Sequence, residues 1–323
     1  MPPRLALDPP LLNAACPWAT DLSYLRALYA SPSTGAITTR TSLVDGYPHD
    51  DAVNTFVFFD PAHPSSVTGV FPQSFPASAD SNSASLNSFG LSPIKLAEYL
   101  SFAATLADEA LAAGRKPKPI VISVTGSTPQ DTGAAIRAVL AAAPRIKAPL
   151  AIEVNLSCPN VPGHPPPAYD ATGLADYLAA FPSNPPLPVG LKTPPYTHAD
   201  QFAMLVAAVA ANRDKVSFLT STNTLGNCLV LQGEAPALPE LGFGGMAGPA
   251  IHPLSLGNVA TLRRLLDASG LADVDLVGVG GVADAAGYAR MRAAGARFVG
   301  VATALGRHGP AVFDAILAPR ARL

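Results

Sequence analysis

Short runs of apolar, often β-branched residues alternate with amphipathic stretches along most of this chain. The apolar runs are continuous, which is typical of parallel strands that are covered by helices. They occur at residues 35–41, 119–126, 150–157, 188–193, 216–223, 275–281 and 297–303. Helical periodicity lies between them, at residues 93–114, 129–143, 172–181, 198–212, 255–269 and 283–294. Repeated strand–helix units of this kind predict α/β architecture.

Two of these helices carry start signals. Thr128 stands directly before a proline, a pair that favours a helix N-cap followed by the first helical residue. Thr197 is followed three residues later by Asp200, which resembles a capping box with the shorter Asp in place of Glu. Seven strands are visible in this way, and we expect the eighth near residues 53–59 or just before Asn87.

Strand–helix units can form either a closed barrel or an open, doubly wound sheet. Polar residues and glycines follow nearly every strand here, whereas an open sheet would concentrate them at one switch point. We therefore predict a (β/α)₈ TIM barrel with its site at the C-terminal ends of the strands. The barrel would form a single domain over residues 1–323, with a Pro/Ser-rich loop inserted at about 61–85.

The composition fits a chain that buries a large core and carries no charged surface for polyanions. Hydrophobic residues make up 49% of the sequence and charged residues 14%, with a formal net charge of −2. No block of like charges occurs, so nothing indicates nucleic acid or an anionic membrane as a partner. No apolar stretch is long enough to span a bilayer and no signal peptide is recognisable, so we expect a cytoplasmic protein.

Cysteines and histidines indicate neither a disulfide framework nor a metal site. The three cysteines, Cys16, Cys158 and Cys228, have no CxxC spacing and are expected to be reduced thiols. The six histidines are scattered through the chain without paired spacing, so no metal is expected.

The most specific motif, Asn155-Leu-Ser-Cys-Pro-Asn160, closes the strand at 150–157. Its two asparagines offer amide donors and acceptors that suit a planar ring with amide or imide edges. A thiol titrates near ~8.5, so Cys158 between them could act as a general base. The alternative is a buried apolar cysteine, which is what most free cysteines are. The asparagine pair and the Gly/Pro-rich segment 161–170, which could close over a substrate, favour catalysis.

Lys192 ends the next strand and is one of only six lysines in the chain. In an otherwise apolar strand its charge needs an anion or an acceptor. An ion pair with Glu153 on the neighbouring strand would satisfy it, but we favour a role in holding negative charge within a site. Asn223-Thr224, after the following strand, is ambiguous by itself, and turn chemistry explains the next Gly-Asn pair.

Three glycine clusters follow, at residues 243–248, 278–281 and 300–303. The last two end the strands that we count as seventh and eighth. TIM barrels often bind phosphate at this place, through backbone N–H groups and a helix N-terminus. None of the clusters fits GxGxxG or a P-loop, so the prediction is a phosphate group rather than a particular nucleotide.

Six motifs resemble those of the class 1 dihydroorotate dehydrogenases, especially the fumarate-linked class 1A branch: NLSCPNVPG, GLKTPPY, STNTLGN, FGGMAGPAI, GVGGV and VATAL. The similarity extends over about residues 11–315, in the same order and with similar spacing. It implies a barrel that binds FMN, in agreement with the fold prediction above. It also implies a homodimer that acts on dihydroorotate and fumarate.

The resemblance implies a role for each matching residue. Cys158 would take a proton from C5 of dihydroorotate while a hydride leaves C6 for N5 of FMN, and Lys192 would lie at the N1/O2 edge of the flavin. Residues implied to bind the pyrimidine ring and its carboxylate are Arg40, Asn87, Phe89, Gly90, Leu91, Asn155, Asn160, Asn223 and Thr224. Residues implied to surround FMN and its phosphate are Ala14, Ala15, Arg40, Asn155, Lys192, Gly245, Gly248, Gly280, Gly281, Ala302 and Thr303.

The chain departs from the family pattern at several positions. Arg40 stands where the family usually has lysine, and arginine keeps the charge but is bulkier and forked. The chain has Asn13-Ala-Ala-Cys16 in place of Asn-Ala-Ser-Gly, and Phe89 in place of the commoner Met. The segment 61–85 is also longer than the family pattern. These differences bear on the identity of the substrate more than on the flavin chemistry.

We therefore expect oxidation of dihydroorotate to orotate in pyrimidine biosynthesis, with fumarate as the electron acceptor. One alternative is a related flavoenzyme that acts on another cyclic amide or dihydropyrimidine. A second is a catalytically silent FMN-binding protein, and a third is a phosphate-binding barrel isomerase or lyase. The last would be colourless, whereas a flavoprotein is yellow.

Overall fold

The computed structural model describes residues 2–68, 81–160 and 166–318 and contains a barrel of eight parallel strands. Around the barrel these strands are β1 (Leu11–Asn13), β2 (Ile37–Thr38), β6 (Ile120–Val124), β7 (Leu150–Asn155), β8 (Val189–Thr193), β9 (Phe218–Ser221), β14 (Asp275–Val279) and β15 (Phe298–Val301). A parallel bridge between Leu12 and Ala36 joins the two ends of the sheet. The predicted (β/α)₈ barrel is confirmed.

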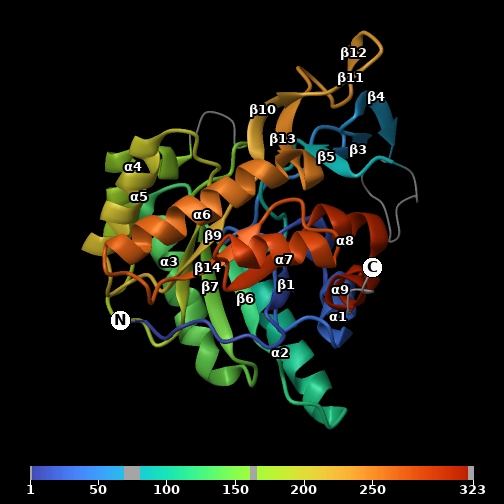
Figure 1. Cartoon of the computed structure of the whole chain (residues 1–323). Helices are drawn as coiled ribbons and strands as arrows, with labels where there is room; N and C mark the ends of the chain where they lie inside the picture. Colours follow the sequence, from blue (N-terminus) through green and yellow to red (C-terminus); the bar gives the residue numbers. More distant parts are fainter. Residues whose placement is uncertain (1, 69–80, 161–165, 319–323) are drawn as a thin grey trace.

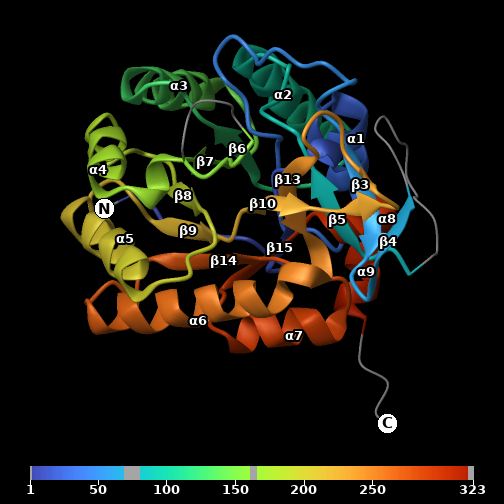
Figure 2. The same cartoon turned by 90° about the horizontal axis from the view of Figure 1, so that it is seen from above.

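Helices cover the outside of the barrel, as Figures 1 and 2 show. They are α1 (Leu22–Ala30), α2 (Leu96–Ala112), α3 (Pro129–Ala142), α4 (Ala171–Ala179), α5 (Ala199–Ala211), α6 (His252–Ala268), α7 (Ala285–Ala293), α8 (Thr303–His308) and α9 (Ala311–Leu317). Short 3₁₀ turns lie at Pro17–Ala19, Ala143–Arg145, Pro167–Tyr169 and Gly248–Ile251. In the described part of the chain, no helix combines the length and the apolarity that crossing a membrane requires.

The six helices predicted from periodicity are all present, with their ends shifted by a few residues. Thr128 caps α3 as predicted, because its hydroxyl oxygen accepts the N–H of Asp131 at 3.1 Å. The start of α5 is one residue later than predicted, with His198 as the N-cap. Gln201, rather than Asp200, accepts the backbone N–H of His198 at 3.2 Å, because its longer side chain reaches back over the first turn.

A second, antiparallel sheet lies over the C-terminal end of the barrel (Figure 1). Its strands, in spatial order, are β10 (Leu225–Leu229), β13 (Phe243–Ala247), β5 (Ala84–Asn87), β3 (Phe56–Asp60) and β4 (His63–Thr68). The strands β11 (Leu231–Gln232) and β12 (Ala235–Pro236) pair with each other as a separate small ribbon. Because β10 follows β9 directly, this sheet forms one wall above the barrel mouth.

Two sequence predictions are wrong in this region. The segment at 53–59 and the residues before Asn87 do form strands, but they are β3 and β5 of the second sheet. The missing barrel strand is β1, which has only three residues, all buried, and therefore leaves almost no local pattern. Part of the predicted loop at 61–85 is strand β4, and residues 69–80 of that segment lie outside the described chain.

Side chains fill the barrel interior. Phe218 of β9 points inward and fits because Gly190 of β8 has no side chain, since a Cβ there would lie 2.3 Å from the ring. Leu5 and Leu7, from the segment before β1, pack against the same cluster. Burying a phenylalanine side chain contributes about 1.5–3 kcal/mol, so this packing stabilises the closed barrel. As in other TIM barrels, space for a ligand is left at the C-terminal ends of the strands.

Candidate active site

A cavity with two connected lobes opens at the C-terminal ends of the barrel strands. The Cys158 lobe spans about 730 Å³, and the glycine lobe, around Gly248, Gly280 and Gly281, spans about 640 Å³, both including space that is open to solvent. The residues that line both lobes, and so join them, are Ala15, Lys192, Asn223, Thr224, Ala247, Ala302 and Thr303.

All the residues that were expected to act in catalysis or ring binding line the Cys158 lobe. They are Arg40, Asn87, Phe89, Gly90, Leu91, Asn155, Cys158, Asn160, Lys192, Asn223 and Thr224. These residues lie at or just after the ends of β2, β5, β7, β8 and β9, which are far apart in the sequence. The barrel and the second sheet therefore bring together polar groups that lie after separate strands in the sequence.

Asn155 and Asn223 are held rigidly through Ser157. The Asn155 carboxamide oxygen accepts the backbone N–H and the hydroxyl of Ser157, at 3.1 and 3.0 Å. Asn223 Nδ2 donates to the Ser157 carbonyl at 3.0 Å, and Asn155 Nδ2 donates to Thr41 Oγ1 at 3.1 Å. Both asparagines are buried, so fixed amide groups face the lobe without the entropy cost of ordering them on binding.

Asn160 and Asn87 are a second pair of asparagines in the Cys158 lobe, and they are hydrogen-bonded to each other. Asn160 Nδ2 donates to the carbonyl oxygen of Asn87 at 3.1 Å and to that of Phe89 at 2.9 Å. Asn87 Nδ2 donates in turn to the carbonyl oxygen of Gly245 at 2.9 Å. Gly245 therefore holds Asn87 in place through its carbonyl oxygen. It does not line either lobe, although the sequence predicts it beside the cofactor. These contacts hold both side chains in fixed orientations at the wall of the Cys158 lobe.

Cys158 follows β7 and is partly exposed to the lobe. Burial raises the pKa of its thiol, and the Asn160 N–H and the charges of Lys192 and Arg40 oppose this shift without cancelling it. The protonated thiol therefore dominates at neutral pH. Residues 161–165, part of the segment expected to close over a substrate, lie outside the described chain.

Lys192 lies where the two lobes meet, and the residue is only 4% exposed. It pairs in register with Asn155 on β7. The alternative ion pair with Glu153 is not formed among the described residues, and Glu153 instead accepts the Ser123 hydroxyl at 3.1 Å. The Lys192 ammonium is therefore placed to meet negative charge on a ligand that extends across both lobes.

Arg40 is buried at the side of the Cys158 lobe and is held in one orientation. Its guanidinium donates to the Leu91 carbonyl at 3.1 Å and lies over the ring of Phe89, 4.9 Å from the centroid. Burial lowers the pKa of Arg40, but an arginine remains charged at neutral pH. Two of the departures from the family pattern, Arg40 and Phe89, are thus direct neighbours.

The charged side chains that line the site are all basic. Arg40, Lys192 and Arg307 line the two lobes, whereas no Asp or Glu is found among the described residues that do so. Cationic side chains that line a partly buried cavity raise the local concentration of anions. The site therefore suits a ligand with negative groups in both lobes.

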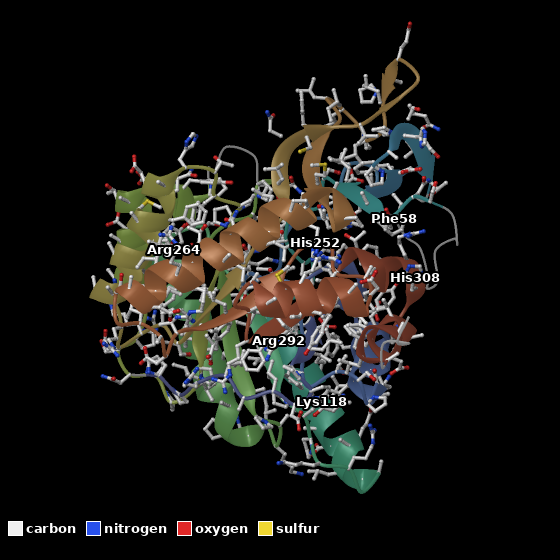
Figure 3. The ribbon with its side chains drawn as sticks, in the orientation of Figure 1. Phe58, Lys118, His252, Arg264, Arg292 and His308 are labelled. Carbon is white, nitrogen blue, oxygen red and sulfur yellow. The ribbon has the colours of Figure 1, made fainter. Side chains whose placement is uncertain are left out.

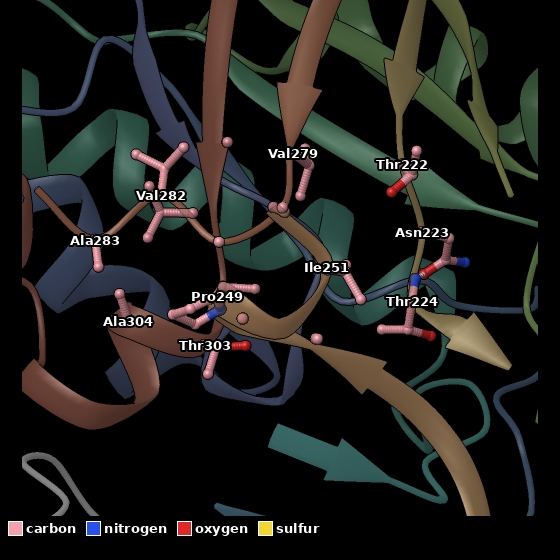
Figure 4. A pocket seen from close by; sticks show the side chains of 18 of the residues that line it. Thr222, Asn223, Thr224, Pro249, Ile251, Val279, Val282, Ala283, Thr303 and Ala304 are labelled. Carbon is pink, nitrogen blue, oxygen red and sulfur yellow. Dashed lines mark hydrogen bonds between the residues drawn. The ribbon is translucent and has the colours of Figure 1, made fainter. Parts of the chain in front are cut away.

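The glycine lobe is built mainly from backbone and small side chains, as Figure 4 shows at the ends of β14 and β15. Gly248, Gly280 and Gly281 have φ values of +81°, +140° and +68°, which other residues rarely adopt. A Cβ on Gly248 would lie 2.9 Å from the backbone of Ala84, so the space is also closed to a side chain. The first N–H groups of α8, from Thr303, have no acceptor within the helix. These features fit the phosphate of FMN.

Of the other residues expected at the cofactor, Ala14, Ala15, Ala302 and Thr303 all line the glycine lobe. Sequence reasoning missed several lining residues, including Trp18, Thr41, Phe56, Ser85, Thr222 and Arg307. Arg307 had a usable signal, because it is a basic residue in the helix that directly follows the last glycine cluster. The others come from loops and from the second sheet, whose position the sequence does not reveal.

Comparison with known proteins agrees with this geometry. The family model for dihydroorotate dehydrogenase matches residues 71–319. A protein of Streptococcus pyogenes serotype M5 named "Putative dihydroorotate dehydrogenase A (fumarate)" is 34% identical over 245 residues, which are 75% of this chain and 73% of the relative. A protein of the same name from Streptococcus agalactiae serotype Ia has the same identity and coverage. The chain belongs to the dihydroorotate dehydrogenase family.

Proposed function

We propose that this chain uses FMN to oxidise dihydroorotate to orotate, and that fumarate then reoxidises the flavin. The proposal rests above all on one observation: Cys158 and Lys192 line a single cavity that continues into the glycine lobe. A potential base, a buried cation and a phosphate-type cradle are therefore parts of one site.

The glycine lobe and the junction would hold FMN. Backbone around Gly248, Gly280 and Gly281 would take the phosphate. Ala15 and Ala302, which line both lobes, have small side chains that take up little space between them. Lys192 contributes positive charge at the junction, which stabilises an anionic ring edge. FMN, when bound, supplies the acceptor for the hydride that leaves C6 of the substrate.

The Cys158 lobe would bind the pyrimidine ring. The fixed amides of Asn87, Asn155, Asn160 and Asn223 match the alternating N–H and C=O groups of a cyclic imide. The Arg40 guanidinium provides a counter-charge for the substrate carboxylate. Such a set of preformed contacts holds the ring in one orientation and keeps C5 and C6 in place.

Cys158 Sγ would take the proton from C5. The thiolate is the active form, and the neighbouring charges of Lys192 and Arg40 favour it against the effect of burial. A positioned general base contributes about 10²–10⁴-fold to a rate. The ring asparagines would hold the substrate so that this proton faces the sulfur, while the cations stabilise charge that develops on the ring.

The electron acceptor, the cytoplasmic location and the homodimer belong to the same proposal. Fumarate is supported by the names of the streptococcal relatives. The homodimer and the location are supported by the resemblance of the sequence motifs. Sedimentation of the purified protein would measure the oligomeric state directly.

Anaerobic mixing tests the central claim. The purified protein should be yellow, its flavin absorbance should bleach when dihydroorotate is added, and fumarate should restore the colour. A yellow protein that dihydroorotate does not bleach would remove the substrate from the proposal. The contact between Arg40 and Phe89 favours one second candidate, a related cyclic amide, and the same assay with other dihydropyrimidines would identify it.

A further inference from the structure

His252 opens helix α6 directly behind the glycine lobe, where α6 runs beside α7 (Figure 3). It is buried, yet it does not line the cavity itself. Its Nδ1 lies 2.7 Å from the carbonyl oxygen of Gly280, and its Nε2 lies 3.1 Å from Nε of Arg290 on α7. The imidazole thus connects the charged side chain of Arg290 on α7 to the backbone of the glycine lobe at Gly280.

These two contacts determine which nitrogen of the His252 imidazole carries the hydrogen. A carbonyl oxygen can only accept, so Nδ1 of His252 must carry the hydrogen and donate it to Gly280. The Arg290 Nε–H can only donate, so Nε2 must be the acceptor. The same logic orients histidines that bind metals, where the partner of the second ring nitrogen sets the tautomer.

The Gly280 carbonyl belongs to the same peptide group as the Gly281 N–H. In a trans peptide these two groups point in opposite directions. Gly280 and Gly281 line the cavity and His252 does not, so a carbonyl held by His252 directs the Gly281 N–H toward the lobe. Within the part of the chain that the structure describes, no protein acceptor receives this N–H.

The surroundings keep this peptide in place. A Cβ on Gly281 would lie 2.7 Å from Cβ of His252, and one on Gly280 would lie 1.9 Å from the Ser255 hydroxyl. The Ser255 hydroxyl in turn lies 3.2 Å from that of Thr222, at the end of β9. The peptide is therefore clamped between α6 and the barrel, and the imidazole selects which way its dipole points.

We infer that Arg290, His252 and the Gly280–Gly281 peptide form a relay that directs positive polarity at the phosphate of the cofactor. Every hydrogen bond in the relay points the same way, from the guanidinium to the imidazole, then to the peptide and into the lobe. Hydrogen bonds in such a chain polarise and strengthen one another. The inference rests on the proposed binding of FMN, and it makes His252 and Arg290 positioning residues rather than direct ligands.

Two flavins separate this role from a purely structural one. Riboflavin is FMN without the phosphate, so the relay should affect the affinity for FMN and leave that for riboflavin unchanged. Apoprotein would be titrated with each flavin, and the quenching of flavin fluorescence would give both Kd values. Both are measured on one preparation, so partial misfolding changes them alike and leaves their ratio intact.

For His252→Leu, which fills the space but cannot donate, we expect FMN to bind about tenfold more weakly with riboflavin affinity unchanged. His252→Asn keeps a donor near the position of Nδ1 and should retain most of the preference for FMN. Arg290→Met should weaken FMN binding by only about two- to fivefold, because the hydrogen bond from His252 remains. In the His252→Leu background, Arg290→Met should have no further effect. His198→Leu, at the exposed start of α5, is the matched control.

The outcomes are distinct. If the wild-type apoprotein does not bind FMN, the proposed function fails and the relay fails with it. If the wild type binds FMN but His252→Leu keeps the same ratio of the two Kd values, only the relay is overturned. A parallel loss of both flavins would likewise assign His252 to the stability of the fold.

Discussion

The two lobes of the cavity are built in different ways. In the Cys158 lobe the polar groups belong to side chains, such as those of Asn155, Asn223 and Arg40, held in place by further hydrogen bonds. In the glycine lobe they belong to the backbone, which is accessible because Gly248 and Gly281 carry no side chain. Changes in the first lobe should therefore alter chemistry without removing the cofactor, and changes in the second should do the reverse.

The largest effect is expected for Cys158→Ala. The rate at which dihydroorotate reduces the flavin should fall by about 10²–10⁴-fold, because the general base is lost. The affinity for FMN should stay within about twofold, because Cys158 lies outside the glycine lobe. Stopped-flow reduction and a flavin titration measure the two quantities separately. Near-normal reduction in this variant would exclude Cys158 from the mechanism, and loss of FMN would remove the distinction between the lobes.

The pH dependence of the wild-type enzyme tests the same thiol without a mutation. Burial raises the pKa of the Cys158 thiol above the ordinary range of a free thiol, so only a small fraction is thiolate at neutral pH. The rate of flavin reduction should then rise about tenfold for each pH unit up to the thiol pKa. Anaerobic stopped-flow across neutral and alkaline pH measures this slope. A rate that is flat through this range would assign the proton transfer to another group.

In the glycine lobe we expect Gly248→Ala to weaken FMN binding by about tenfold or more. A left-handed backbone costs other residues roughly 1–2 kcal/mol, and the added methyl would also press on the Ala84 backbone. At saturating FMN the reduction rate should be close to that of the wild type. Gly257→Ala is the matched control, since a Cβ there meets nothing within 4 Å. Equal FMN affinity in the two variants would contradict a backbone-built cradle.

The difference between a lobe built from side chains and a lobe built from backbone also explains how much of the molecule could be predicted from the sequence. Side-chain motifs after the strands are visible locally, and the barrel brings Asn155, Cys158 and Lys192 together as expected. Local patterns do not reveal pairing partners, so the sequence alone predicts a barrel strand at 53–59, where the fold has β3 of the second sheet. Strand β1 has too few residues to show a period. His252 could not be found, because its importance depends on a contact with Gly280 that only the folded chain creates.

The smallest effect is expected where a departure from the family pattern can be tested on its own. Phe89→Leu keeps an apolar side chain but removes the ring beneath Arg40, a contact worth about 0.5–2 kcal/mol when partly desolvated. The KM for dihydroorotate should rise by about threefold to tenfold with little change in kcat, because Arg40 binds the carboxylate before and during the reaction.

Phe58→Leu makes the same substitution at a buried ring that stacks on Trp18 and does not line the Cys158 lobe. It should lower stability without changing KM, so thermal melting and steady-state kinetics on both variants separate packing from recognition. If Phe89→Leu leaves KM unchanged while Phe58→Leu behaves as expected, Arg40 does not depend on the ring. The leucine at position 89 would then be as good a support as phenylalanine, and the hydrogen bond from Arg40 to the Leu91 carbonyl would suffice to orient the guanidinium.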